Sequence, residues 1–339
     1  MHKEFLMGNA AIALGAVAAG VNVVAGYPGT PSTEVLETIA KHRPDDVYVE
    51  WSVNEKAAME LAAGASYAGA RSMVTMKQVG LNVASDPLMS LEYVGIKGGM
   101  VILVADDPGP ISSQTEQDTR HFSRFSKLPC FDPSSAQEAY EMIQEAFEYS
   151  EKYGTPVFLR PTTRVCHGYA SIMVKDETEY THHQPEGFIK DSKRWVIFPR
   201  LSFMNHKKIE ARNQELSDVF SSYEKNKIHP SCDAFKDSKK GIATGGISYT
   251  YTMETLKKTG MVKTLKIATP HPFPEKLAVD FLSGLDEVLC LEELDPVIER
   301  ELIYICGKYH LPTRINGKLS GHTACAGENT RDTITTYIN

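Results

Sequence analysis

Apolar runs and helix-forming segments alternate through the first half of the chain, and this alternation limits the fold more than any other feature. Short apolar runs predict strands at 21–25, 47–51, 72–76, 100–105 and 156–160. Helical patterns lie between or before them, at 10–19, 32–41, 81–90 and 135–150, and another begins near Glu55. Strands that alternate with helices indicate a parallel sheet with helices on both faces.

A second alternation begins at residue 239. It predicts strands at 241–245, 265–268, 287–291 and 313–316, with helices at 248–258, 274–282 and 296–307. Between the two alternations the pattern weakens, and we interpret 176–238 as a linker with one helix at 206–226. The predicted fold class is therefore α/β, with two doubly wound parallel-sheet domains at 1–175 and 239–339. A length of 339 residues is consistent with two domains.

Composition excludes several classes of function. A net charge of -7 argues against a nucleic-acid partner. No apolar stretch approaches the ~20 residues that a membrane-spanning helix needs, so we expect no membrane partner. The six cysteines form no C-x-x-C pair, which argues against a zinc or iron–sulfur site in this chain. Reduced cysteines favour a cytoplasmic location.

Residues 52–69 form an Ala- and Gly-rich segment that opens with Glu55, directly after a predicted strand. Ser52 and Glu55 have the S-x-x-E spacing of a capping box, which would make Glu55 a purely structural residue. The small residues nearby favour another reading, because they let a flat ligand approach the backbone. A carboxylate in that position can meet a ring nitrogen of a heteroaromatic ligand.

Two further loops follow predicted strands, at the sheet edge where ligands of open α/β folds bind. In loop 27–32, the Gly29 backbone permits close approach, and Thr30 offers a hydroxyl to a carboxylate or phosphate. Thr30 with Pro31 also suits an N-cap followed by the first helical residue. In loop 77–82, Gly80 permits a tight turn and Asn82 offers an amide.

A third loop, at 106–118, begins with two aspartates. Asp106 and Asp107 are able to hold Mg²⁺, but a solvated turn is the favoured interpretation. Ser112, Ser113, Gln114 and Gln117 make this segment polar enough to predict a pocket wall.

The second half of the chain contains fewer candidate functional residues. The glycine-rich segment 241–246 lacks the G-K-[ST] ending of a phosphate loop, so we predict a strand-to-helix turn there. Glu292 and Glu293 follow a predicted strand, and we expect them to be solvated or to face a partner subunit.

Taken together, several segments resemble the alpha subunit of the indolepyruvate:ferredoxin oxidoreductases, which are thiamine-diphosphate enzymes of 2-oxo acids. The matching segments run through nearly the whole chain in order: 26–34, 50–55, 76–84, 106–109, 112–118, 244–249 and 292–296. The resemblance implies that 1–175 is a pyrimidine-binding domain and that 239–339 is a transketolase C-terminal-like domain.

The same resemblance implies roles for single residues. Glu55 is expected to be catalytic, because its carboxyl would bind the aminopyrimidine ring nitrogen and favour the tautomer that removes the thiazolium C2 proton. Cofactor binding is expected at Pro28, Gly80 and Asn82 as well as Glu55. Substrate binding is expected at Thr30, Gly29 and Gln114. No residue of this chain is expected to bind a metal.

The chain also departs from the family pattern. The long form of the family continues into a diphosphate-binding domain with a G-D-G motif that holds Mg²⁺, and then into a ferredoxin-like region with clustered cysteines. Neither is present, so thiamine diphosphate would be shared with a partner, and Mg²⁺ and iron–sulfur clusters would lie in that partner or in a missing region. We expect the chain to be inactive alone, as a fragment, a split subunit or a degenerate relative.

The expected reaction is oxidative decarboxylation of an aryl 2-oxo acid, such as indolepyruvate, with coenzyme A and with ferredoxin as electron acceptor. The expected partners are a diphosphate-binding subunit, a beta subunit and ferredoxin, within a homo- or hetero-oligomer. A non-catalytic assembly or regulatory subunit with the same fold is the alternative. A transketolase-class enzyme is a weaker reading, since no histidine lies near Thr30.

Overall fold

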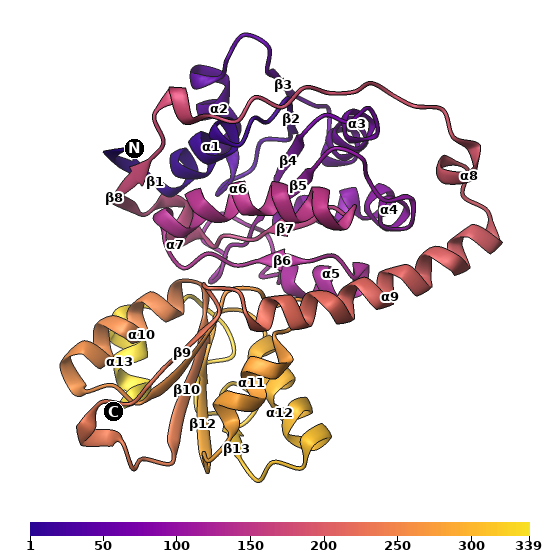
Figure 1. The fold of residues 1–339 in the computed structure, drawn as a ribbon. Coiled ribbons are helices and arrows are strands. Elements are labelled where there is room, and N and C mark those ends of the chain that lie inside the picture. Colours follow the sequence, from indigo (N-terminus) through magenta and orange to yellow (C-terminus); the bar gives the residue numbers. More distant parts are fainter.

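The computed structural model describes residues 1–339, which form two α/β units joined by a long connecting segment (Figure 1). The first unit contains a six-stranded sheet with the order β3-β2-β4-β5-β7-β6, and all its neighbouring strands are parallel. Its strands are β2 (Val23–Gly26), β3 (Tyr48–Trp51), β4 (Ser72–Lys77), β5 (Met100–Ala105), β6 (Cys130–Phe131) and β7 (Val157–Leu159). The predicted parallel sheet is confirmed.

Helices cover both faces of this sheet. One face carries α1 (Gly8–Ala18), α2 (Thr33–His42) and α6 (Ala136–Tyr153), which pack through Ile12, Ile39, Ile143 and other buried residues. The other face carries α3 (Glu55–Tyr67) and α4 (Gln78–Val94), with α5 (Thr119–Ser126) beside α4. Each face therefore has its own apolar core, as expected of a doubly wound sheet.

Two short strands that the sequence analysis did not predict extend this unit. β1 (His2–Met7) and β8 (Tyr169–Val174) form an antiparallel pair. Helix α1 begins at Gly8, so Asn9 lies inside it and not before it. The buried Asn9 amide donates to the Pro31 carbonyl and to Glu34, and this ties α1 to the start of α2.

The connecting segment runs along the outside of the first unit (Figure 1). It contains α8 (Ser192–Trp195) and the long helix α9 (Pro199–Ser221), which begins and ends earlier than the predicted 206–226. After α9, β9 (Lys227–His229) pairs antiparallel with β11 of the second sheet. That strand lies among residues that the sequence analysis placed in the linker.

The second unit contains a five-stranded sheet with the order β13-β12-β10-β11-β9, parallel except for β9. Its other strands are β10 (Lys240–Gly245), β11 (Lys263–Ile267), β12 (Glu287–Leu291) and β13 (Arg314–Asn316). Helices α10 (Gly246–Thr259) and α13 (Arg331–Ile338) pack on one face, and α11 (Glu275–Leu282) and α12 (Val297–Tyr309) on the other. The remaining short helix, α7 (Thr163–His167), follows β7 in the first unit.

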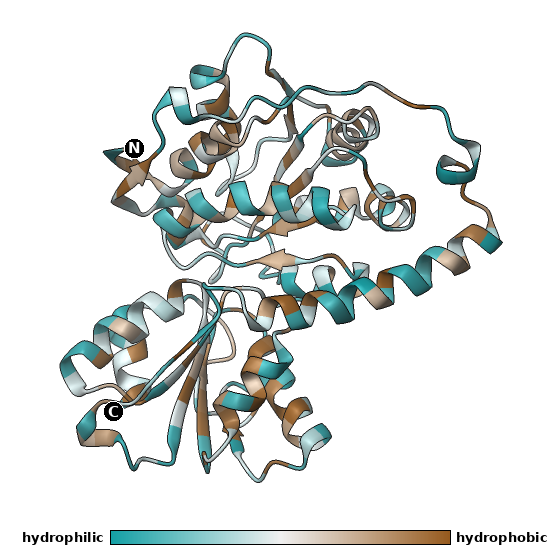
Figure 2. Cartoon of the chain, in the orientation of Figure 1, coloured by the Kyte–Doolittle hydropathy of each residue, from teal (hydrophilic) through white to brown (hydrophobic).

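Hydropathy follows this layering. In Figure 2 brown segments recur in the strands of both sheets, with teal and pale segments among them in the second unit, and α9 alternates between teal and brown along its length. Buried parallel strands read as continuous apolar runs, which is why β5 and β12 match their predicted bounds without error. No helix is long and apolar enough to cross a lipid bilayer.

Candidate functional site

Glu55 is the first residue of α3, at the carboxyl end of β3. The N-cap of this helix is Asn54, whose side chain accepts from the Ala57 amide at 2.9 Å. Ser52 Oγ instead donates to Glu50 at 3.0 Å, so the capping box that the S-x-x-E spacing allows does not form. The Glu55 carboxylate makes no hydrogen bond or ion pair within the chain, and its side chain is only half-buried. It is therefore available to a ligand.

Gly80 lies directly against this carboxylate. It is a buried residue in the first turn of α4 with helical geometry, so the tight turn that we predicted there is wrong. A Cβ atom at position 80 would lie 2.8 Å from Cδ of Glu55 and nearer still to Oε1. Only glycine leaves the carboxylate where it is, because any side chain would displace it. The structure thus joins two residues that the sequence analysis chose separately.

The loop after β2 has a different local structure from the predicted one. Helix α2 begins at Thr33 with Ser32 at its N-cap, so Thr30 and Pro31 precede the helix, and the peptide bond between them is cis. The Gly29 amide donates to Thr33 Oγ1, and Ser32 Oγ donates to the Gly29 carbonyl, both at 2.9 Å. These bonds hold the loop while Thr30 stays exposed.

Side chains from the other loops meet at the same edge of the sheet. A Cβ atom at Gly29 would lie 3.0 Å from Cγ of Lys77, and Lys77 Nζ donates to Gln114 Oε1 at 3.5 Å. The Asn82 amide donates to Gln117 Oε1 at 3.0 Å. Ser112 Oγ donates to the Thr30 carbonyl at 3.2 Å. The loops after β2 and β5 thus contact the junction of β4 and α4, as their place at the carboxyl ends of the strands predicts.

The paired aspartates that open the third loop are anchors and not solvated groups. Asp106 is fully buried and accepts from the Thr119 amide and from Arg160 Nε, at 3.0 and 2.6 Å. Asp107 is equally buried and accepts from the Ser112 amide and from Thr163 Oγ1. Burial raises the pKa of Asp106 to about 6, although Arg160 opposes the shift. The predicted solvated turn is therefore wrong.

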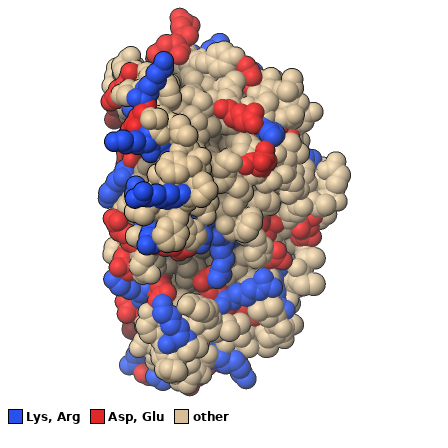
Figure 3. Space-filling model, turned by 90° about the vertical axis from the view of Figure 1, so that its right-hand side faces the viewer, with Lys and Arg blue, Asp and Glu red and all other residues tan.

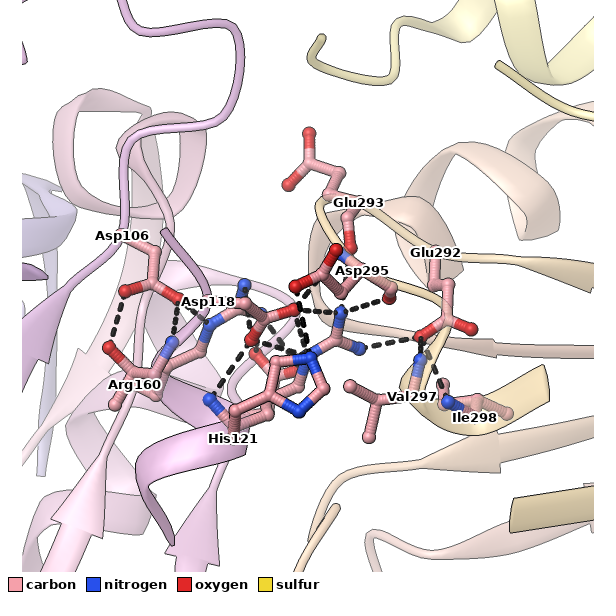
Figure 4. A network of polar contacts seen from close by, with 12 residues as sticks. Asp106, Asp118, His121, Arg160, Glu292, Glu293, Asp295, Val297 and Ile298 are labelled. Carbon is pink, nitrogen blue, oxygen red and sulfur yellow. Dashed lines mark hydrogen bonds and ion pairs between the residues drawn. The ribbon is translucent and has the colours of Figure 1, made fainter. Parts of the chain in front are cut away.

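An ion-pair network ties the far end of this loop to the second unit (Figure 4). Arg120, which is buried, pairs with Asp118 at 2.6 Å and with Glu292 at 2.7 Å. Glu292 also accepts from the amides of Val297 and Ile298 at the start of α12, where an anion is favoured. Glu292 and Glu293 are both buried, so the sequence analysis was wrong to expect a solvated or partner-facing pair.

Exposed apolar side chains surround the edge that holds Glu55. They come from the segments that follow β2, β3, β4 and β5: Tyr27, Val53 and Ile111 lie in loops, and Val83 lies in α4. Apolar groups gathered on one exposed edge typically mark a contact surface. Glu55 and its neighbours therefore lie on a candidate contact surface.

A sequence profile of the family described as pyruvate flavodoxin/ferredoxin oxidoreductase, thiamine diphosphate-binding, matches residues 14–240. Indolepyruvate oxidoreductase subunit IorA of Methanothermobacter thermautotrophicus is 43% identical over 324 residues, which are 94% of this chain and 51% of that protein. The chain thus spans about half the length of this relative.

Solved structures share the fold. A 2-oxoglutarate:ferredoxin oxidoreductase from Magnetococcus marinus has a TM-score of 0.77 at 17% identity, over 99% of this chain and 64% of that one. A split gene transketolase has a TM-score of 0.61 at 14% identity, over 98% and 95% of the two chains. The predicted fold class, two doubly wound domains of the thiamine-enzyme type, is confirmed.

Proposed function

The chain belongs to the pyruvate flavodoxin/ferredoxin oxidoreductase family, and we propose on that basis that it supplies the aminopyrimidine half of a thiamine diphosphate site. One observation carries the proposal. The Glu55 carboxylate has no partner within the chain and lies against Gly80, where any added side chain would displace it, at an exposed edge. This arrangement fits a flat ring with a nitrogen that shares a proton with a carboxyl group.

Each predicted site residue then has a task. A Glu55 carboxyl oxygen holds the proton at the ring nitrogen, and Gly80 leaves room for that contact. Pro28 and Asn82 border the same ring. We assign binding of the substrate carboxylate to Thr30, Gly29 and Gln114. Lys77 contacts Gly29 and Gln114, and Ser112 contacts Thr30, so these residues lie close together.

When bound, thiamine diphosphate supplies the electron sink for loss of CO₂ from a 2-oxo acid. The proposed reaction converts an aryl 2-oxo acid, such as indolepyruvate, and coenzyme A to an acyl-CoA and CO₂, and passes the electrons to ferredoxin. The choice of substrate follows the named relative IorA. A diphosphate-binding partner with Mg²⁺ and iron–sulfur clusters, together with a beta subunit, completes the assembly. Six free cysteines suit a reducing cytoplasm.

Replacing Glu55 tests the proposal. We expect Glu55→Gln to lower indolepyruvate-dependent ferredoxin reduction at least about 100-fold in the complex reconstituted with the partner, because general acid–base groups contribute that much. Glu60→Gln is the matched control, since Glu60 is an exposed carboxylate on the same helix. Binding of thiamine diphosphate to the complex is measured alongside, and we expect weaker binding in the Glu55 variant only.

Unchanged activity and cofactor binding in Glu55→Gln would contradict the catalytic assignment. If the complex that contains this variant is as active as the native complex, the non-catalytic assembly subunit becomes the favoured interpretation.

A further inference from the structure

A cavity of about 430 Å³ lies between the first unit and the connecting segment, outside the site described above. Its walls come from the end of α4, the end of α6, and residues of α8 and α9. Val94, Ile96, Leu201 and Ile209 contribute apolar surface. Its size falls within the ~300–1,000 Å³ that small-molecule sites usually occupy.

Basic groups dominate the polar part of this cavity. Lys193, Arg194, Lys208 and Arg212 all line it, against Glu92 and Asp191. Arg212 pairs with Glu92 at 3.0 Å, and Arg194 donates to the Ile96 carbonyl at 2.6 Å. The ammonium groups of Lys193 and Lys208 have no acidic partner, although the chain as a whole has a net charge of -7. In Figure 3, which views the molecule from the side of α8, blue Lys and Arg side chains and red Asp and Glu side chains alternate along the left margin, and further blue side chains lie in the middle.

Two polar oxygens of the wall lie behind the cavity surface. Glu92 is 3% exposed; its Oε1 accepts from Arg212, whereas its Oε2 has no hydrogen bond, and the hydroxyl of Tyr153 has none either. Both oxygens have almost no accessible area, so they leave hydrogen-bonding capacity unmet beside the cavity but do not themselves contact a ligand. Burial raises the pKa of Glu92 to about 8 despite Arg212, which keeps it able to donate a proton at neutral pH.

We propose that this cavity binds an organic phosphate of nucleotide size. Lys193 and Lys208 bind the phosphate, because each carries three donors on a flexible stem. The apolar walls cover the uncharged part of the ligand. Inorganic phosphate would leave most of the space and the apolar walls unused.

This site is separate from the proposed cofactor site. Gly80 and Glu92 lie near opposite ends of α4, roughly 18 Å apart at the rise of an α-helix. The cavity borders Ile96 and Gly154, which precede β5 and β7, so it lies at the amino ends of the strands. Ligand binding there does not depend on the function proposed for Glu55.

The test uses the 339-residue chain and ADP as the probe, titrated calorimetrically at about 0.15 M salt, which screens unspecific surface charge. We expect ADP to bind more tightly than inorganic phosphate or adenosine alone. Lys193→Ala combined with Lys208→Ala should weaken ADP binding by about 10-fold or more, which is about 1.4 kcal/mol.

Lys207→Ala is the matched control. Lys207 neighbours Lys208 on α9 but lies over the Phe203 ring and does not line the cavity, so ADP binding should not change. Glu55→Gln should also leave ADP binding unchanged, which separates this proposal from the proposed function. No binding of ADP, equal binding by phosphate alone, or equal binding by the double variant would each overturn it.

Discussion

At the scale of single residues, the proposed site centres on the contact between Glu55 and Gly80. Both residues could be selected from the sequence, because a carboxylate and a glycine after parallel strands stand out. Their local roles could not: a capping box at Ser52 and a tight turn at Gly80 are both reasonable readings of short patterns. Asn54 takes the cap instead, and this leaves the Glu55 carboxylate without a structural task.

Gly80→Ala should therefore weaken cofactor binding without a large loss of helix stability. The added methyl group collides with the Glu55 carboxylate, and we expect thiamine diphosphate affinity of the reconstituted complex to fall by about 10-fold or more. Gly64→Ala on α3 is the control, since a Cβ there meets nothing within 4 Å. That control should bind the cofactor normally and gain about 0.5–1 kcal/mol of stability in urea. Equal affinity in both variants would contradict the steric argument.

At the scale of elements, pattern length decided which predictions succeeded. The long apolar runs of β4, β5 and β12 are predictable because burial on both faces makes them continuous. β6 has 2 residues, and α5 has only eight residues, of which two are apolar, Phe122 and Phe125, so both patterns are too short to predict an element. Yet α5 supplies Arg120, which holds loop 106–118 against the second unit. Its importance appears only in three dimensions.

Arg120→Met should destabilise the chain strongly, because it leaves Asp118 and Glu292 buried without their partner. Removing one member of a buried ion pair typically costs about 3–5 kcal/mol. Arg124→Met on the same helix is the control: the Arg124 side chain is 61% exposed, and an exposed pair contributes about 1 kcal/mol or less. Urea unfolding of both variants measures the difference. If the two variants are equally stable, the buried network contributes no more to the free energy of unfolding than an exposed ion pair does.

At the scale of the whole molecule, buried carboxyls give the chain an unusual pH dependence. Burial raises the pKa of Glu92 to about 8 and that of Glu293 to about 7. A group with a raised pKa in the folded chain stabilises it at low pH, and that contribution is lost as the pH rises through the folded value. These two groups therefore favour the folded state less at pH 8.5 than at pH 6.

We expect the free energy of unfolding to fall between pH 6 and 8.5, by up to about 1.4 kcal/mol per pH unit for each such group. Glu92→Gln removes one of them, so its unfolding free energy should change less over this range. Urea unfolding of the native chain and the variant at both pH values measures this difference. Parallel curves for the two proteins would show that Glu92 is already ionised at pH 6.

By itself, the sequence determined the fold class and the strand ends at which we propose the site, because hydrophobic periodicity and strand ends are local properties of the chain. Only the tertiary structure decided which of these residues meet. Glu55 needs Gly80 from another helix, Asp106 needs Arg160, and Glu292 needs Arg120 from the other unit. The sequence suggested that Asp106, Asp107, Glu292 and Glu293 are solvated, but the structure buries them. Their burial depends on packing between segments far apart in the chain, and no local sequence pattern records that packing.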